Sequence, residues 1–319
     1  MIVTTNFTNS EADVTRYPDG AALRDFVRGH GLDGLELMPV GGFELGYIPP
    51  ELVIGVHLPC LTSWVDFWRG DEAALIGEFG CLETVRQVFG GDRPADMLAP
   101  LREGMALAKR VGARYVVFHI SNVTLSEAAS YRPVHTDEEV CAAAAEVINA
   151  VADPEIEFLA ENLWWPGLTF LRPEVTRELM EAVRAPRKGI VLDAGHLMHT
   201  NLDLSAQREA VEYIHRRLDA HGPLCRYIRG LHLHQSLTGD YVRRMLAQGV
   251  ALTGDYWRDF GNFFPHVFNI DRHEPFDIPE ARGLVERLAP EYLTHEFITE
   301  SSARHSAFLR TQMKALGRF

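Results

Sequence analysis

Short apolar runs alternate along the chain with longer segments of helical periodicity. The segments between the runs, such as Ala95–Val111 and Pro173–Val183, have the apolar spacing of helices. A strand, helix, strand order throughout predicts a parallel sheet, and eight such units predict its closure into a (β/α)₈ barrel. The predicted strands are Ile2–Thr5, Gly34–Met38, Val53–Leu58, Tyr115–Ile120, Glu157–Glu161, Gly189–Asp193, Ile228–His234 and Tyr292–Phe297.

Two connections between these strands are unusually long. One runs from Pro59 to about Pro94 after the third strand, and the other from Gln235 to about Phe268 after the seventh. Connections of this size in a compact domain are usually lids or binding elements, so both are expected to lie over the binding face. No Gly/Pro/Ser-rich linker or short-period repeat divides the chain, which predicts a single TIM-barrel domain over residues 1–319.

Composition narrows the class of protein. The 319 residues are 46% apolar and 24% charged, which is typical of a chain with a sizeable core. Neither an apolar run of membrane-spanning length nor a signal-peptide pattern at Met1–Asn9 is found, so a cytoplasmic enzyme without a membrane partner is the expectation. The net charge of −13 disfavours a broad nucleic-acid footprint, although DNA stays possible. Four scattered cysteines without a CxxC pair predict reduced core residues, at Cys60, Cys81, Cys141 and Cys225.

Ligand-type side chains recur where the predicted strands end. In a parallel barrel the last inward residue of each strand lies at the mouth, and six consecutive strands carry His, Asp or Glu there. Several buried carboxylates among imidazoles would be costly without a cation, whereas divalent metals bind this mixture. The residues are His57, His119, Glu161, Asp193, His232 with His234, and Glu296.

Two further pairs extend the candidate site. His196 follows Asp193 after Ala194 and Gly195, a tight turn that can return the imidazole to the same place. Asp271 and His273, two residues apart in an extended segment, point to one side. On the seventh strand His232 and His234 share a face, so the ligand is undecided, with His232 favoured. Glu36 fits packing or substrate binding as well as it fits a metal, and structural roles are expected for His199, His295 and His305.

Aromatic residues in the predicted loops are candidate substrate contacts. Trp64 and Trp68 lie in the long third loop, and Trp164 and Trp165 follow Glu161-Asn162. Packing of the lids is the competing interpretation. The predicted substrate-binding set is Trp64, Trp68, Trp164, Trp165, Asn162 and His234.

The ordered motifs resemble the xylose-isomerase-like barrels, which include sugar isomerases and epimerases and the endonuclease IV group. They are "DGLEL", "GVHLP", "AEN", "LDAGH" and "HLH", followed by Glu296, and they span nearly the whole chain. The isomerase branch implies one divalent metal on Glu161, Asp193, His232 and Glu296, with both glutamates as acid/base groups.

The endonuclease IV group implies a three-zinc cluster, and the chain has a counterpart for each of its nine ligands. Glu161 would bridge two metals, and Asp271-Arg272-His273 distinguishes this set from the isomerase set. The long connection from His232 to Asp271, the enlarged third loop and the absence of basic loops argue against DNA. The nine ligands are His57, His119, Glu161, Asp193, His196, His232, Asp271, His273 and Glu296.

The resulting hypothesis is a multinuclear-metal hydrolase acting on a small or non-DNA phosphodiester, with Glu161, Glu296 and His196 as catalytic residues. It would hold two or three divalent ions, zinc first, with manganese or iron as alternatives. A divalent-metal sugar isomerase or epimerase is the second hypothesis. A multinuclear non-haem iron oxidase and a barrel that binds metal without catalysis are the third and fourth. The oligomeric state is left open.

Overall fold

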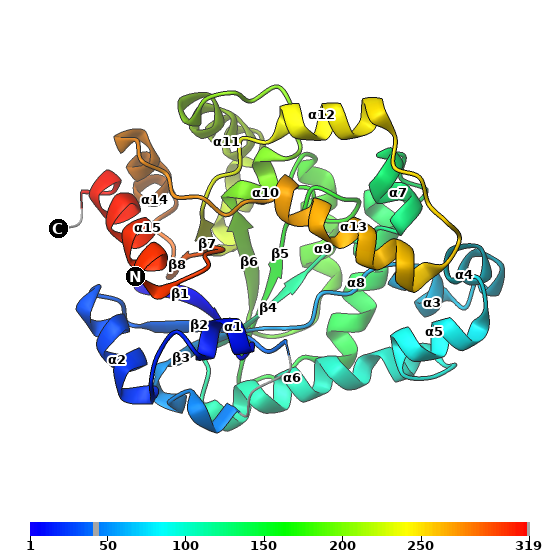
Figure 1. Cartoon of the computed structure of the whole chain (residues 1–319), viewed down its shortest axis with the longest axis horizontal. Helices are drawn as coiled ribbons and strands as arrows, with labels where there is room; N and C mark the ends of the chain where they lie inside the picture. The colour runs from blue at the N-terminus through cyan, green and yellow to red at the C-terminus, as the bar shows by residue number, and fades with distance from the viewer. Residues whose placement is uncertain (41–44, 318–319) are drawn as a thin grey trace.

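Eight parallel strands close into a barrel in chain order (Figure 1). The computed structural model describes residues 1–40 and 45–317. Ile2 on the first strand pairs with Tyr292 on the last, so the predicted (β/α)₈ TIM barrel is confirmed. The first strand runs to Thr8, three residues further than predicted. The strands are β1 (Ile2–Thr8), β2 (Gly34–Met38), β3 (Val53–His57), β4 (Tyr115–His119), β5 (Glu157–Glu161), β6 (Lys188–Asp193), β7 (Ile228–Leu233) and β8 (Tyr292–His295).

Helices surround the barrel, and local sequence signals set their ends. Thr136 and Glu139 form a capping box at the start of α8, and Gly112, with φ of 72°, ends α6 in the left-handed conformation that glycine favours. The helices between or after the strands are α1 (Glu11–Val14), α2 (Gly20–Gly29), α6 (Leu98–Val111), α7 (Leu125–Ser130), α8 (Asp137–Val151), α9 (Pro173–Ala182), α10 (Ala194–Met198), α11 (Gln207–His221), α14 (Arg282–Leu288) and α15 (Ser302–Ala315). Short 3₁₀ turns are η1 (Leu45–Tyr47), η2 (Pro50–Leu52), η3 (Pro94–Met97), η4 (Gly222–Tyr227) and η5 (Pro279–Ala281).

The expected alternation of strand and helix fails between β2 and β3. In the described part of that connection, residues 39–40 and 45–52, the chain forms only η1 and η2. Pro39, Pro49 and Pro50 lie in this short segment, and proline lacks the N–H that a helix interior needs. The prediction of a helix after every strand was therefore wrong here.

Side chains of the strands alternate between two cores. The outward Val116 and Phe118 of β4 belong to the main apolar layer under the helices, whereas Tyr115 and Val117 belong to a small inner cluster. His119 is the next inward position. The period of two is repeated in β5: Glu157 accepts a hydrogen bond from Tyr292 at the bottom of the barrel, Leu159 joins the inner apolar cluster, and Glu161 lies at the mouth.

The two enlarged connections are helical. Residues after β3 form α3 (Trp64–Arg69), α4 (Glu72–Phe79) and α5 (Leu82–Phe89), and residues after β7 form α12 (Gly239–Gln248) and α13 (Tyr256–Ile270). Figure 1 shows α12 and α13 toward the end to which β6 points. Side chains of α13 line the same cavity as Phe7, His119 and Glu296 from the strand ends, so this helix covers part of the mouth.

Two expectations from the sequence concern membrane-spanning helices and the burial of the cysteines. No helix within residues 1–40 and 45–317 is long and apolar enough to cross a membrane. All four cysteines are free thiols, but only Cys141 is buried, Cys225 is half-buried, and Cys60 and Cys81 are exposed. The prediction of four core cysteines was thus wrong for the two exposed ones, because both lie in the connection after β3 rather than in a strand or a core helix.

Candidate metal centre

The nine predicted ligands gather at the mouth of the barrel. Within the described residues these nine and His234 form three groups, in each of which the ligand atoms lie within 4.8 Å of one another. Each side chain comes from the end of a strand or from the connection that follows it, where His196 lies in α10. The groups are His57, His119 and Glu161; Glu161, Asp193, His232 and Glu296; and His196, His234, Asp271 and His273.

Glu161 belongs to two of these groups, and its two carboxylate oxygens are divided between them. Oε2 lies 3.0 Å from Nε2 of His57 and 3.2 Å from Nε2 of His119. Oε1 lies 3.1 Å from Nδ1 of His232 and 3.4 Å from Nδ1 of His196. The side chain is completely buried at the end of β5. A carboxylate in this position can bridge two cations.

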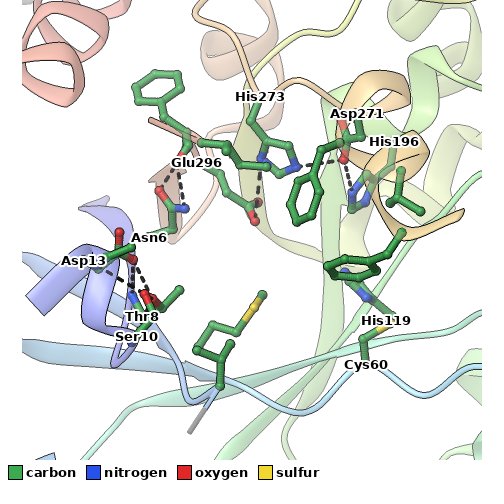
Figure 2. Close-up of a pocket in the computed structure, with 18 of the residues that line it drawn as sticks. Asn6, Thr8, Ser10, Asp13, Cys60, His119, His196, Asp271, His273 and Glu296 are labelled. Carbon is green, nitrogen blue, oxygen red and sulfur yellow. Dashed lines mark hydrogen bonds and ion pairs between the residues drawn. The ribbon is translucent and has the colours of Figure 1, made fainter. Parts of the chain in front are cut away.

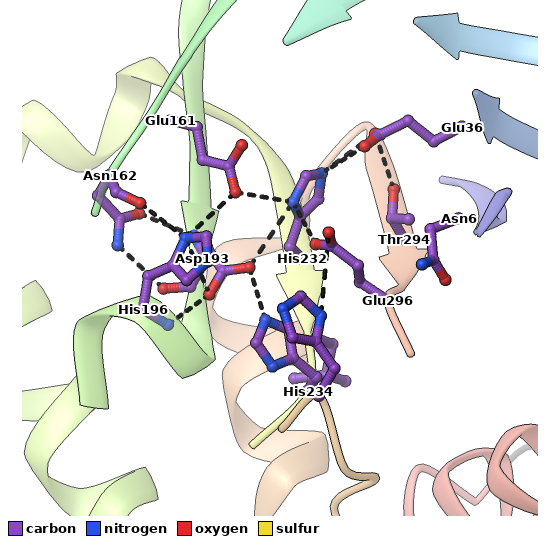
Figure 3. Close-up of polar contacts among 12 residues, drawn as sticks. Asn6, Glu36, Glu161, Asn162, Asp193, His196, His232, His234, Thr294 and Glu296 are labelled. Atoms are coloured by element: carbon purple, nitrogen blue, oxygen red, sulfur yellow. Dashed lines mark hydrogen bonds and ion pairs between the residues drawn. The ribbon is translucent and has the colours of Figure 1, made fainter. Parts of the chain in front are cut away.

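His232 faces three carboxylates with one nitrogen (Figure 3). Its Nδ1 lies 2.8 Å from Oε2 of Glu296, 3.1 Å from Glu161 and 3.7 Å from Asp193. One N–H cannot satisfy three buried carboxylates, and the carboxylates repel one another. A divalent cation among them would resolve both problems, so this donor set fits a metal ion.

Glu36 lies on the other side of His232, inside the barrel. Its carboxylate accepts hydrogen bonds from Tyr115 (2.8 Å) and Thr294 (3.2 Å) and lies 3.1 Å from Nε2 of His232. A carboxylate that holds the second nitrogen of a metal-binding histidine fixes the ring and raises its basicity. This positioning role was left open by the sequence, because only the fold shows that Glu36 lies beneath His232.

The two histidines of strand β7 belong to different ligand groups. His232 belongs to the Glu161 group, whereas His234 lies with His196, Asp271 and His273. The ring of His234 stacks on that of His273 at 3.9 Å, and its Nε2 lies 2.8 Å from Oδ2 of Asp193. His234 is fully buried and does not line the cavity. The substrate contact expected of it is therefore not supported.

Three of the imidazoles are held in the way that metal-binding histidines usually are. Nδ1 of His57 donates to the carbonyl of Leu58, and Nδ1 of His196 donates to the carbonyl of Asn162. Because a carbonyl only accepts, Nδ1 of each ring carries a proton, and Nε2, the nitrogen that a cation would bind, faces a carboxylate, Glu161 or Asp271. With His232 on Glu36, the pattern is one of fixed rings whose free nitrogens converge, which fits bound cations.

A cavity of about 710 Å³ opens onto this cluster (Figure 2). Of the candidate ligands, those that line it are His119, His196, Asp271, His273 and Glu296. Trp164 and Trp165 also line it, as expected, whereas Trp64 and Trp68 do not. The remaining ligands lie beneath this layer, so a substrate would meet the cluster from the His119, His273 and Glu296 side.

The two tryptophans of the third connection were predicted to contact substrate, and the structure places them elsewhere. Trp64 is fully buried in the main core and donates its Nε1–H to the carbonyl of Ser121, and Trp68 donates to Glu146 on α8. Both hydrogen bonds join α3 to the connection after β4 and to α8. Asn162 is also away from the cavity: its amide bonds to the backbone carbonyl and N–H of Asp193 and so fixes the backbone that carries the Asp193 carboxylate.

Comparison with known proteins places the chain in a family. Residues 91–310 match the model described as xylose isomerase-like TIM barrel. The chain is a member of this family. No curated protein sequence matches it.

Solved structures share the fold at low sequence identity. Endonuclease IV from Thermus thermophilus is 14% identical over 100% of both chains, with a TM-score of 0.55. The 3-keto-D-glucoside 4-epimerase from E. coli is 12% identical over 98% of this chain and 99% of its own, with a TM-score of 0.51. The IolI protein, whose structure holds a zinc atom, is 13% identical over 100% and 99%, with a TM-score of 0.53. At this distance the similarity establishes the barrel and leaves the reaction open.

Opposite charges within the candidate metal centre of this chain compensate one another. Burial raises the pKa of a carboxyl, but His119 and His232 outweigh burial and hold the pKa of Glu161 well below its usual range. Burial lowers the pKa of an imidazole, yet Glu161 raises the pKa of His119 to about 10, and Asp271 raises that of His273 to about 9. Without a cation the site is thus a network of carboxylates and imidazolium ions.

Two side chains that the sequence did not single out for this site support Asp271. Oδ1 of Asp271 accepts a hydrogen bond from Ser236 (3.0 Å) and lies 3.2 Å from Nε2 of His199. Oδ2 faces His196 and His273 instead. His199 follows His196 by three residues, so one helical turn was the available signal, and the structural role expected of it stays a prediction. Ser236 gave no signal of its own.

Proposed function

We propose that the chain is a metal-dependent hydrolase that holds two or three divalent ions and cleaves a small phosphodiester. The observation that carries the proposal is the division of the two Glu161 oxygens between two ligand groups, with a third group beside them. A single-metal enzyme needs only one of these groups. The fuller set is the one expected of a multinuclear site.

The residues that would hold the ions follow from the three groups. His57, His119 and Glu161 would hold the first, and Glu161, Asp193, His232 and Glu296 the second. His196, Asp271 and His273 would hold the third, with His234 next to them. Bound divalent ions would polarise a phosphoryl oxygen and lower the pKa of a water molecule. Zinc suits this donor set, and manganese and iron do so too.

The chain's own side chains would position the substrate and handle its protons. Glu296 lines the cavity, whereas Glu161 and Asp193 do not, so it is the carboxylate of the second group that can reach a substrate oxygen. It would accept a proton from the attacking water or return one to the leaving group. His196, held by the carbonyl of Asn162, also faces the cavity, and as a ligand of the third ion it would help to fix the place where the phosphodiester binds.

A sugar isomerase or epimerase is the second candidate. The Glu161, Asp193, His232 and Glu296 group is a complete four-ligand set by itself. In that reaction Glu161 and Glu296 would move a proton at the carbon next to a metal-polarised carbonyl. His57, His119 and the Asp271/His273 pair would then have no direct part in the chemistry, and this is why the hydrolase is preferred.

The metal content of the purified protein separates the two candidates. It is measured by elemental mass spectrometry on protein never exposed to chelators or to a polyhistidine column. Two or three ions per chain support the hydrolase, and iron among them points to an oxidase. A single ion, with no release of products from phosphodiesters, moves the assignment to the isomerase.

A substitution at the bridging residue tests both candidates together. Glu161→Gln keeps the shape of the side chain but offers one carbonyl oxygen in place of two charged ones, so we expect bound metal to fall by at least one ion per chain and activity to be lost. The exposed Glu286→Gln on α14 is the matched control. Full activity of Glu161→Gln would refute the hydrolase and the isomerase alike.

A further inference from the structure

The walls of the cavity above the metal cluster are mainly aromatic and aliphatic. One wall is α13, on which four aromatic side chains follow one another at four-residue spacing and so share one face. Neighbouring rings contact each other, with centroids 6.0, 5.4 and 5.0 Å apart. This aromatic stripe consists of Tyr256, Phe260, Phe264 and Phe268, and all four line the cavity.

Apolar side chains also form the other walls. Trp164 and Trp165 follow β5, while Phe7 of β1, Met38 of β2 and Phe297 after β8 line the cavity from the barrel side. Near the cluster the apolar lining gives way to the polar groups of His119, His273 and Glu296 (Figure 2). The cavity therefore has one metal-binding end and a much larger apolar part.

Four of the apolar side chains that line the cavity are exposed. Among the described residues, the large hydrophobic side chains with high exposure include Val40 (55%), Phe264 (46%), Phe268 (47%) and Ile298 (44%), and these four line the cavity. Leaving apolar surface of this extent in contact with water is unfavourable, and contiguous patches of this kind usually mark a binding site. A ligand with its own apolar surface would cover them.

The described lining of the cavity has few basic side chains that could bind a polyanion. Among the described lining residues Arg16 is the only lysine or arginine, and its guanidinium is 2.9 Å from Asp13 and also bonds to Thr299. Phosphates along a nucleic-acid strand are bound by several basic side chains, which this cavity lacks. The hydroxyl of Thr8 donates to Asp13, and Asn6 bonds to the backbone of Phe297, so these polar groups are engaged within the protein.

We infer that the substrate is an amphiphile: an anionic phosphoryl group at the metal ligands, and an extended apolar body along the aromatic stripe. The inference rests on the proposed function for the phosphoryl group, and on the cavity walls alone for the apolar body. A cavity of about 710 Å³ lies within the range of roughly 300–1,000 Å³ that small-molecule sites occupy. An aliphatic chain and a flat ring system both provide an apolar body of this kind, and phosphonates that carry one or the other distinguish them.

Binding of non-hydrolysable phosphonates to the zinc-loaded protein tests the apolar part separately from catalysis. Methylphosphonate, octylphosphonate below its micelle concentration and naphthylmethylphosphonate share one head group and are compared by titration calorimetry. We expect octylphosphonate or the naphthyl compound to bind at least tenfold more tightly than methylphosphonate. The tighter of the two identifies an aliphatic or an aromatic body.

Two variants of one helix locate the effect. Phe264→Asn removes an exposed ring of the stripe and should abolish most of the preference for the apolar phosphonate. Trp257→Asn is the matched control, since Trp257 is equally exposed (50%) on α13 but does not line the cavity. We expect the control to keep the preference. Equal affinities for the three phosphonates, or equal effects of the two variants, would overturn the inference.

The failure of the inference and that of the proposed function give different results. Hydrolysis of a short phosphodiester with no preference for apolar phosphonates would leave the hydrolase standing and refute the amphiphile. A clear apolar preference with two or three metals but no hydrolysis of any phosphodiester would refute the hydrolase and retain the amphiphile. If Phe264→Asn instead converts a dimer to a monomer in sedimentation without changing phosphonate affinity, the stripe is a subunit interface and the inference is wrong.

Discussion

Gly195 lies between Asp193 and His196, and the ring of His234 fills the space that a side chain at position 195 would need. A Cβ there would lie 2.1 Å from Cε1 of His234. We predict that Gly195→Ala displaces His234, lowers the free energy of unfolding by about 1–3 kcal/mol through overpacking and reduces bound metal at the third group. Urea unfolding and elemental analysis measure the two effects.

Gly77→Ala on α4 is the control for this substitution. Nothing lies within 4 Å of a Cβ at Gly77, so alanine should raise the helix stability by about 0.5–1 kcal/mol and leave the metal content unchanged. If Gly195→Ala keeps the full metal content and stability, the ring of His234 is free to move, and its place in the third group is not fixed by packing.

His305 is a buried histidine outside the three candidate ligand groups, and it gives a pH dependence of its own. Thr5 donates its hydroxyl to the carbonyl of His295, so it accepts from Nε2–H of His305; Nδ1 then accepts from Thr299. Burial, with Arg16 and His30, lowers the pKa of His305 to about 4. The neutral ring is therefore the form that fits.

The stability linked to His305 is present above its unfolded pKa of about 6.5 and is lost as the pH falls toward about 4. The unfolded chain binds the proton first, so the free energy of unfolding should decrease over this window by about 3 kcal/mol from this residue. Urea unfolding of the metal-free protein and of His305→Gln at several pH values isolates the effect. Parallel pH profiles of the two proteins would contradict the prediction.

At the scale of elements, the start of α3 depends on a side chain from another connection. Ser63, in the left-handed region at φ of 52°, does not cap the helix. Oδ1 of Asn122, after β4, accepts from the backbone N–H groups of Trp64 (2.9 Å) and Val65 (3.1 Å) instead. We predict that Asn122→Ala lowers the free energy of unfolding by about 1–3 kcal/mol, because two buried donors lose their acceptor.

Urea unfolding measures this change, with Asn269→Ala as the control. Asn269 is exposed near the end of α13, where its replacement should change stability by no more than about 0.5 kcal/mol. Faster amide exchange in α3 of Asn122→Ala would locate the loss. Equal stability of the two variants would mean that packing of Trp64 alone holds α3.

Which elements the sequence predicts depends on whether the signal is local. Apolar runs bounded by polar residues predicted all eight strands, because each strand is buried on both faces. The connection after β3 was expected to be a lid, but its helices α3, α4 and α5 and the burial of Trp64 depend on partners such as Asn122 and Ser121. Such contacts span some sixty positions and leave no periodic signal.

For the whole molecule, the register of the barrel explains why the candidate ligands could be predicted and their partners could not. Inward positions at strand ends meet at one mouth in any closed parallel barrel, so position alone predicted that His119, Glu161 and Asp193 would lie together. Glu36 and Asn162 act through other residues, at His232 and Asp193. Their roles follow from which strands are neighbours across the barrel and from side-chain direction, neither of which the sequence displays.

The whole barrel should be more stable with metal than without it, because the ligands come from the ends of β3 to β8 and from Asp271 and His273. An ion bound only by the folded chain adds about 2.7 kcal/mol at one hundred times its dissociation constant. We therefore predict that zinc raises the melting temperature of the chelator-treated protein by several degrees, and that Glu161→Gln loses most of this increase.

The increase in melting temperature caused by zinc should become smaller as the pH is lowered. Without metal, the pKa of His119 is about 10 and that of His273 about 9, so both rings are protonated at pH 7 and a cation must displace their protons. Zinc should therefore release protons on binding, measurable with a pH-stat, and its stabilising effect should shrink as the pH is lowered. Identical melting curves with and without zinc at pH 8 would mean that the carboxylates and imidazolium ions satisfy one another. The cluster would then be a structural charge network, and the proposed hydrolase would lose its metals.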